Sequence, residues 1–262
     1  MNIFVCVKQV PDTETKIKPN SDSTYIDTSS IKWVMNPYDE FAVEQALQIK
    51  AKASDSTITV VRVGAKKDTE ALRTAMAMGA DEAILVDAPD HLDSYVTAKA
   101  IKGAIEKSGK TADLILMGKQ AIDDDCLQVP QILAELMNYP CVNVVVEMEG
   151  SDNTFTVKRE IEGGSKEIYD LVTPAIVSCN KGLNTPRYAS LPGIMKAKKK
   201  PLTEYSLADA GVSESDQKVT YTNFELPAEK PAGKKFEAME DDQISGVASE
   251  VVGFLRNEAK VI

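Results

Sequence analysis

The stretch TITVVRVGAKKDTEALRTAMAMGADEAILVDA, residues 57–88, places two short apolar runs on either side of one helical pattern. The apolar runs are rich in Val and Ile, which is typical of strands buried on both faces. The middle spaces Leu72, Ala75 and Met76 at i, i+3 and i+4 and reaches Gly79, which favours a helix with a glycine C-terminal cap. A strand, a helix and a second strand in succession predict parallel strands joined by a crossover helix.

The same alternation continues on both sides of this unit. Apolar runs occur at residues 2–10, NIFVCVKQV, and 113–118, DLILMG. Helical patterns occur in SYVTAKAIKGAIEKSG and in NPYDEFAVEQALQIK, where Asn36 stands as a candidate N-cap before Pro37. We therefore expect an α/β protein with a mostly parallel sheet covered by helices.

The chain changes character after about residue 141. The runs CVNVVVEMEG, TFTVKREIEGG and KEIYDLVTPAIVSC predict successive strands, a β-meander that completes the sheet. Residues 183–235 are richer in Pro and Lys and have weak periodicity, so we expect an extended arm there. Residues 236–262 regain a helical apolar stripe, formed by Ile244, Val247, Val251, Phe254 and Leu255. We therefore divide the chain into an α/β domain, 1–182, an arm, 183–235, and a C-terminal helix, 236–262.

Composition makes several classes of function poor choices. The 262 residues carry a formal net charge of −10 and a pI of about 4.8, so nucleic acid is an unfavourable partner. The four cysteines lie far apart and His91 is the single histidine, so we expect no metal site and free thiols in a reducing compartment. No apolar run approaches about 18 residues and no leader precedes the first strand, so we expect a cytoplasmic protein without membrane insertion.

Acidic residues gather at one strand exit, in GKQAIDDDCLQVPQ, residues 118–131. In a parallel sheet, ligands bind beyond the carboxyl ends of the strands, where helix starts present free N–H groups. By that rule four segments converge, namely 6–9, 36–39, 63–65 and 118–129. We expect one aspartate to cap the helix that follows while backbone amides hold phosphate. The alternative interpretation is that all three aspartates are only cap and solvent residues.

Catalytic patterns do not stand out in this sequence. Neither G-x-G-x-x-G nor G-x-x-x-x-G-K-[ST] occurs, so neither a Rossmann dinucleotide site nor a P-loop is expected. Nucleophile–base and paired-carboxylate arrangements are not evident, and we expect His91 to be a solvated surface residue. We therefore expect a protein without catalytic turnover of its own.

Several of these segments together resemble a known family, the β subunit of electron transfer flavoproteins. The resemblance rests on VCVKQVPD, NPYDEFAVEQAL, RTAMAMGADEAILV, GKQAIDDDC, VKREIEGG and PRYASLPGIMKAKKK, in this order over roughly residues 1–200. It implies a doubly wound fold of the adenine nucleotide α-hydrolase type. It also implies a heterodimer whose α subunit holds most of the redox FAD, while the β chain holds AMP.

The resemblance also implies which residues bind the nucleotide. Adenine is expected against Cys6 and Val63. The other contacts are expected from Asn36, Pro37, Tyr38 and Asp39, and from Gly118, Lys119, Gln120, Ala121, Ile122, Asp123, Asp124, Asp125, Cys126, Leu127, Gln128 and Val129. This set coincides with the strand exits that the pattern alone indicates.

Three positions depart from the family pattern. Many relatives have a hydroxyl residue where this chain has Val129, which predicts weaker AMP binding. Some relatives have an aromatic residue in place of Thr13, near the flavin, so the flavin surroundings are expected to differ. Electron-bifurcating relatives, which hold a second FAD and use NADH, read more like DGDT where this chain has DDDC. Asp124 would crowd a dinucleotide, so we expect AMP and the non-bifurcating branch.

The resemblance implies an electron carrier of fatty acid oxidation. Its flavin would accept electrons from acyl-CoA dehydrogenases and pass them to the electron transfer flavoprotein-quinone oxidoreductase. A different class of function is an ATP-using enzyme or nucleotide sensor of the same fold. Such proteins usually carry a Gly- and Ser-rich loop after the first strand, where this chain has VKQVPD.

Two segments are expected to contact partners. The sequence RYASLPGIMKAKKK, residues 187–200, sets apolar side chains among Pro, Gly and lysines with no period that would bury them. It resembles the family's recognition loop, in which a leucine anchors in a pocket of the dehydrogenase. The expected docking residues are Leu191, Pro192, Ile194, Met195 and Lys196, with Lys198, Lys199 and Lys200 steering the approach. The alternative is that Leu191 packs on its own subunit. The helix within 236–262 is expected to dock on the α subunit; the alternative is that it covers the core of its own chain.

Overall fold

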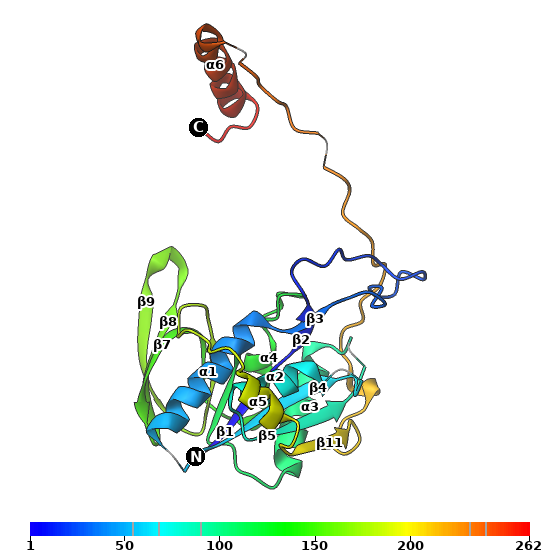
Figure 1. The fold of residues 1–262 in the computed structure, drawn as a ribbon, viewed down its shortest axis with the longest axis vertical. Helices are drawn as coiled ribbons and strands as arrows, with labels where there is room; N and C mark the ends of the chain where they lie inside the picture. Colours follow the sequence, from blue (N-terminus) through cyan, green and yellow to red (C-terminus); the bar gives the residue numbers. More distant parts are fainter. Residues whose placement is uncertain (54, 68, 90, 231, 239) are drawn as a thin grey trace. The chain divides into compact units, whose positions relative to one another are not determined.

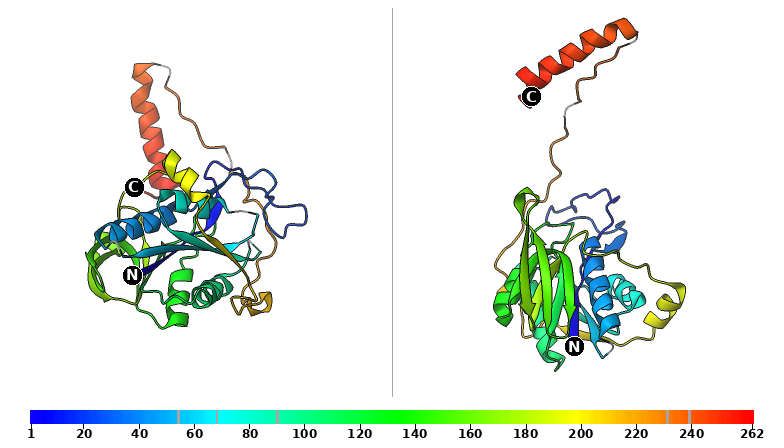
Figure 2. Two further views of the ribbon diagram at one scale, coloured as in Figure 1. Left: turned by 60° about the horizontal axis from the view of Figure 1, so that its bottom comes forward. Right: turned by 90° about the vertical axis from the view of Figure 1, so that its left-hand side faces the viewer.

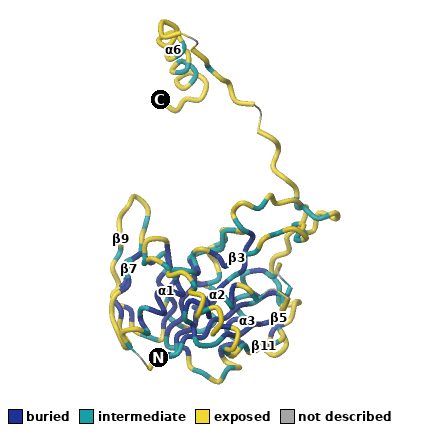
Figure 3. The backbone as a smooth tube through the Cα atoms, in the orientation of Figure 1, coloured by how far each residue is buried: buried dark blue, intermediate teal, exposed yellow. Residues whose placement is uncertain are grey.

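The computed structural model describes residues 1–53, 55–67, 69–89, 91–230, 232–238 and 240–262. The chain forms two compact units, Met1–Phe224 and Glu225–Ile262, and each is described by itself (Figure 1). All of the described buried residues, dark blue in Figure 3, belong to the first unit.

The first unit is built on one large sheet. Its described strands follow the order β11-β5-β4-β1-β6-β10-β7-β8-β9. Neighbours from β11 to β7 are parallel, whereas β7, β8 and β9 pair antiparallel. The strands span β1 Asn2–Cys6, β4 Thr57–Gly64, β5 Glu82–Asp87, β6 Leu114–Gly118, β7 Cys141–Ser151, β8 Thr154–Glu160, β9 Lys166–Val172, β10 Ala175–Cys179 and β11 Leu202–Ser206. A smaller antiparallel pair joins β2, Gln9–Pro11, to β3, Trp33–Met35.

Helices cover both faces of this sheet, as Figure 2 shows. Alternate residues of β1 face opposite sides, because successive side chains of a strand point in opposite directions. Ile3 and Val5 join the core under α1 and α2, whereas Phe4 and Cys6 join the core under α3 and α4. The helices span α1 Pro37–Lys52, α2 Glu70–Met78, α3 Ser94–Lys107 and α4 Val129–Met137. The predicted α/β fold with a doubly wound, mostly parallel sheet is therefore confirmed.

The order of the strands creates a switch point beside β1. The chain moves outward from β1 through β4 to β5, and then returns to place β6 on the other side of β1. The connections after β1 and after β6 therefore diverge to opposite sides. In open α/β sheets such a divergence leaves a crevice at the carboxyl ends of the two strands.

The β-strand pattern after residue 141 is confirmed with one change. β7, β8 and β9 form the expected meander, but KEIYDLVTPAIVSC supplies two strands rather than one. Pro174 lies between them and has no N–H to donate to a ladder. The second of these, β10, returns into the sheet between β6 and β7 and is fully buried.

The expected arm contains more regular structure than its sequence indicated. α5, Leu191–Ala197, and β11, Leu202–Ser206, both belong to the first unit. β11 is an edge strand with mostly exposed or half-buried side chains, so it carries no clear apolar alternation. α5 has seven residues, which is too short to display a helical period. The expectation of an extended arm is therefore wrong for these two segments.

The second unit contains one helix, α6, Asp241–Asn257. Phe236 and Phe254 contact each other with ring centroids 5.5 Å apart, and Lys234 lies 3.7 Å from the Phe254 ring centroid. None of the described residues of α6 is buried. Across the described parts of both units, no helix has the length and apolar character that a membrane crossing requires.

Candidate functional site

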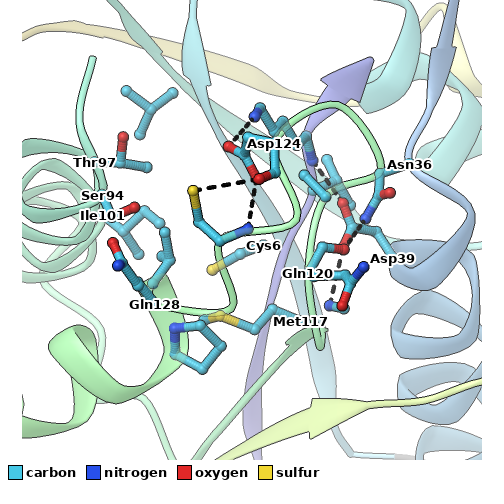
Figure 4. A pocket seen from close by; sticks show the side chains of 18 of the residues that line it. Cys6, Asn36, Asp39, Ser94, Thr97, Ile101, Met117, Gln120, Asp124 and Gln128 are labelled. Atoms are coloured by element: carbon cyan, nitrogen blue, oxygen red, sulfur yellow. Dashed lines mark hydrogen bonds and ion pairs between the residues drawn. The ribbon is translucent and has the colours of Figure 1, made fainter. Parts of the chain in front are cut away.

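A cavity of about 880 Å³, open to solvent, lies at the switch point between β1 and β6 (Figure 4). Its apolar lining includes Cys6, Val61, Val63, Ile101 and Met117. Its polar lining includes Lys8, Asn36, Asp39, Ser94, Thr97, Gln120, Asp124 and Gln128. The four segments that sequence predicted at the strand exits each contribute to this wall.

Asp39 ties the exits of β1 and β6 together from the first turn of α1. One carboxylate oxygen accepts the Lys8 N–H at 2.7 Å and the other accepts the Gly118 N–H at 2.9 Å. The side chain is buried, and this burial raises the pKa of Asp39 to about 7, although the backbone donors oppose the rise. A Cβ at Gly118 would lie 2.4 Å from the carboxylate, so this close approach requires glycine there.

Asn36 has a different task from the expected one. Its side chain makes no helix-capping hydrogen bond among the described residues. Instead Nδ2 donates to the Gln120 carbonyl at 2.9 Å, and Oδ1 accepts the Ile122 N–H at 3.3 Å. The start of α1 therefore holds the 118–129 loop at two places. Asp39 binds Gly118, its first residue, and Asn36 binds Gln120 and Ile122.

The three aspartates of the loop contact Lys8, which follows β1, and Gln120 within the loop. Lys8 Nζ lies 2.8 Å from an oxygen of Asp123 and 2.9 Å from an oxygen of Asp124. Burial lowers the pKa of the Lys8 ammonium, but the carboxylates of Asp123 and Asp124 raise it by more. The pKa of Lys8 therefore lies above its usual value. Asp125 accepts a hydrogen bond from the Gln120 side chain. Lys8 therefore offsets part of the negative charge of the loop, and its contacts with Asp123 and Asp124 fix the loop in place.

The prediction that one of these aspartates caps the next helix is wrong. α4 begins after Gln128, and the part of the chain that the structure describes supplies no side-chain cap. Asp125 and Leu127 both adopt left-handed backbone conformations, with φ of 51°, which turn the loop before the helix starts. The aspartates lie too early in this turn to reach the N–H groups of α4, which therefore stay available to a ligand.

The sequence pattern did not indicate that α3 and the segment before it line the cavity. Pro89 and Leu92, in the segment before α3, and Ser94 and Thr97, in its first turn, line the cavity. Asp93 accepts the Val96 N–H at 2.8 Å and caps this helix. The sequence signal for this wall is the presence of two hydroxyl residues, Ser94 and Thr97, in the first turn after the N-cap Asp93, at the end of a strand–helix connection.

Most of the predicted nucleotide-binding residues lie in the cavity wall, but five do not. Those that line it are Cys6, Asn36, Asp39, Val63, Gly118, Lys119, Gln120, Ala121, Asp124, Cys126, Leu127, Gln128 and Val129. The structure does not bring the other five into the lining, namely Pro37, Tyr38, Ile122, Asp123 and Asp125. Asp123 supports the wall through Lys8, and Ile122 through Asn36. The binding role of all these residues stays a prediction.

The predicted docking residues lie on and around α5. Leu191 is 80% exposed and Met195 is 72% exposed, so Leu191 does not pack inward on its own subunit. Pro192, Ile194 and Lys196 also belong to this helix. Lys200 does not fit the expected steering role, because its Nζ donates to the carbonyls of Met76, at 2.9 Å, and Ala80 at the end of α2.

Sequence comparisons match this chain to known proteins along its whole length. A family model described as electron transfer flavoprotein domain matches residues 24–210. The electron transfer flavoprotein subunit beta of Bacillus subtilis is 40% identical over 267 residues, which covers 100% of both chains. The protein of the same name from Bradyrhizobium diazoefficiens is 40% identical over 264 residues, again 100% of both. The human protein is 38% identical over 245 residues, 92% of this chain and 94% of its own.

The family model spans more than half of this chain. The three relatives match this chain over at least 92% of its length. The matched region contains the start of α1 and the 118–129 loop, which help to line the cavity, and it also contains the exposed helix α5. The chain therefore belongs to the electron transfer flavoprotein family, as a β subunit.

Proposed function

We propose that this chain binds AMP in the switch-point cavity and pairs with an α subunit that holds FAD. The heterodimer then carries electrons from acyl-CoA dehydrogenases to a quinone oxidoreductase. FAD supplies the redox chemistry when it is bound, whereas this chain supplies binding surfaces and no turnover of its own. The cytoplasm of a bacterium is the proposed compartment.

The observation that carries the proposal is the cavity between two helix starts. Of the two, α4 begins at the wall without a side-chain cap among the described residues, and the first N–H groups of such a helix favour a negatively charged group. Cys6, Val61 and Val63 provide an apolar surface for a base. Ser94, Thr97 and Gln128 provide hydroxyl and amide groups for a ribose or a phosphate. This set of residues fits a purine mononucleotide.

The fixed position of Asp124 favours a mononucleotide over a dinucleotide. Its carboxylate lines the cavity and is held 2.9 Å from Lys8 Nζ. A second phosphate placed near this carboxylate would meet a like charge, which disfavours binding. A single phosphate at the start of α4 avoids that contact. We therefore place the protein in the non-bifurcating branch, with one flavin per heterodimer.

Nucleotide content of the co-expressed heterodimer tests this function. We expect denaturation to release one AMP and one FAD per pair, measured by chromatography against standards. Two FAD per pair, together with flavin reduction by NADH, would contradict the proposal in favour of a bifurcating protein. A colourless homodimer that hydrolyses ATP would contradict it in favour of an enzyme.

The Asp124→Gly variant sharpens this test. It removes the carboxylate that faces the cavity, so a larger share of the sites should accept an added dinucleotide. Asp123→Gly is the matched control, because Asp123 also pairs with Lys8 but lies outside the cavity lining. Equal dinucleotide binding by the two variants would show that Asp124 does not select the ligand.

A further inference from the structure

The segment that leads into α5 is fastened to α1 by an ion pair that the nucleotide cavity does not use. The Glu44 carboxylate accepts Arg187 Nε at 2.7 Å and Arg187 Nη2 at 2.9 Å. The same carboxylate accepts the Arg187 backbone N–H at 3.2 Å and Gln48 Nε2 at 3.0 Å. Its side chain is only 5% exposed. Four donors therefore satisfy a carboxylate that is almost removed from water.

The charges of Glu44 and Arg187 attract each other, and the geometry of their hydrogen bonds also fixes how the two side chains are oriented. Burial raises the pKa of Glu44, but the hydrogen bonds from Arg187 and Gln48 outweigh burial and leave the pKa below its usual range. The carboxylate is therefore ionised near neutral pH. A guanidinium that donates two parallel hydrogen bonds fixes the plane and the distance of its partner, which a lysine ammonium does not do.

Additional contacts hold the segment on both sides of α5. Before the helix, Asn184 Nδ2 donates to the Phe41 carbonyl at 3.0 Å and to Gln45 Oε1 at 3.2 Å, both on α1. After it, Arg73 of α2 donates to the Ala197 carbonyl at 3.0 Å. Lys200 then caps the end of α2, as described above. The exposed side chains Leu191 and Met195 lie between these anchor points.

A seven-residue helix needs such anchors because it is not stable by itself. Without them the segment would sample many conformations, and a partner would have to order it during binding. We propose that Glu44 and Arg187 are positioning residues, which hold α5 in its binding conformation before the partner arrives. This inference rests on the docking role that we assign to α5.

Steady-state electron transfer from an acyl-CoA dehydrogenase to the intact heterodimer tests the proposal. In Glu44→Gln an amide NH₂ replaces one acceptor and faces the guanidinium, and in Arg187→Lys the two-pronged donor is lost. For both variants we expect KM for the heterodimer to rise about three- to tenfold, with kcat near the wild-type value. Flavin content and AMP content should remain close to those of the wild type, and melting temperature should fall by no more than about 5 °C, because each variant weakens one ion pair of the fold.

Glu147→Gln is the matched control, because Glu147 also pairs with two cations, Lys158 and Lys166, but lies on β7. It should leave KM unchanged. Unchanged KM in Glu44→Gln and Arg187→Lys would overturn the proposal. A rise in KM that accompanies loss of flavin or of folded protein at the assay temperature would also overturn it, since it would reflect stability.

Leu191→Ala, measured in the same assay, separates this inference from the docking role itself. If Leu191→Ala raises KM and the Glu44 and Arg187 variants do not, α5 docks but the ion pair does not position it. If none of the three variants changes KM, the docking role and the positioning role both fail. If only the ion-pair variants raise KM, the pair acts other than through α5 and the proposal is wrong.

Discussion

α3 and α6 are both amphipathic helices, of 14 and 17 residues, but their apolar faces meet different surroundings. In α3 the apolar face is completely covered, by the sheet and by neighbouring helices; its buried residues are Val96, Ala98, Ala100, Ile101, Ala104 and Ile105. In α6 no described residue is buried, and Ile244 is 53% exposed. A regular apolar stripe therefore predicts that a helix will bury one face, but it does not indicate whether that face packs on the same chain or on a partner subunit.

The starts of the two helices differ in the same way. Asp93 caps α3 and also accepts the backbone N–H groups of Lys218 and Val219 through its second oxygen. At the start of α6, Glu240 makes no side-chain capping hydrogen bond within the described part of the chain. The first unit thus supplies the contacts of α3, both at its cap and along its apolar face. We predict that the α subunit supplies the corresponding contacts of α6.

Removal of residues 236–262 is expected to have the largest effect. The heterodimer should dissociate, because the deletion removes the apolar face of α6, while residues 1–235 keep the core of the first unit. Size-exclusion chromatography with light scattering measures assembly, and thermal unfolding of the isolated chain reports on the fold. An intact heterodimer formed by the truncated chain would contradict the assignment of α6 to the α subunit.

Substitution of one isoleucine in each helix makes the comparison quantitative. Ile105 in α3 is 2% exposed, so Ile105→Ala should lower the free energy of unfolding of the isolated chain by about 2–5 kcal/mol. Ile244→Ala should change the same quantity by less than about 0.5 kcal/mol, and should instead weaken assembly. Denaturant titration of the isolated chain and a binding titration with the α subunit separate the two effects. Equal destabilisation by both substitutions would mean that α6 packs within its own chain.

The sequence predicted the elements whose residues pack locally and repeatedly. The pattern of Leu72, Ala75 and Met76 identified α2, and similar patterns identified α1, α3 and α6. It did not identify α5 or β11, because a seven-residue helix and an edge strand bury too few side chains to leave a period. Local pattern thus reports burial, and it is weak where an element is short or stays exposed.

The candidate site was predictable to a similar extent. Strand exits are set by topology, so the segments around Cys6, Asn36 and Gly118 could be placed together from sequence. The hydrogen bonds of Asn36 to Gln120 and of Asp39 to Lys8 and Gly118 join residues far apart in the chain, and no local pattern encodes them. The same limit explains why the aspartates were assigned to a helix cap rather than to Lys8.

Leu191 provides a third contrast between exposed and buried apolar residues. Leu133 of α4 is completely buried, whereas Leu191 of α5 is 80% exposed. Burying a leucine in a partner pocket contributes about 1.5–3 kcal/mol, so Leu191→Ala should weaken docking by about ten- to a hundredfold. Electron transfer from an acyl-CoA dehydrogenase measures the loss, with melting temperature and flavin content unchanged. Transfer at the wild-type rate, or a loss that follows unfolding, would contradict the anchor role.

Leu133→Ala is the converse control for Leu191→Ala. It should destabilise the chain by about 2–5 kcal/mol, because it leaves a cavity in the core beneath α4. Docking by the fraction of Leu133→Ala molecules that remain folded should stay at the wild-type level. A docking defect in that folded fraction would show that the assay reports general packing rather than contact by α5.

The smallest expected effect concerns the cap of α3, and it depends on pH. Burial raises the pKa of Asp93, but the N–H groups of Val96, Lys218 and Val219 lower it and prevail, so the folded pKa lies below its usual value. A lowered folded pKa means that the stabilisation is complete above the unfolded pKa of about 3.9 and is lost as pH falls below it. Asp93→Asn should cost about 1 kcal/mol near neutral pH, because the amide replaces one carboxylate acceptor with an NH₂ donor.

Denaturant titrations of wild type and Asp93→Asn between pH 7 and pH 3 check both the size and the sign of this effect. The difference in unfolding free energy should be constant from pH 7 to about pH 5 and should shrink as pH falls through the unfolded value. Glu240→Gln at the start of α6 should shift the unfolding free energy by less than about 0.5 kcal/mol at every pH. A difference between wild type and Asp93→Asn that stays constant down to pH 3 would mean that the charge of Asp93 does not contribute, and that its capping oxygen acts equally well when neutral.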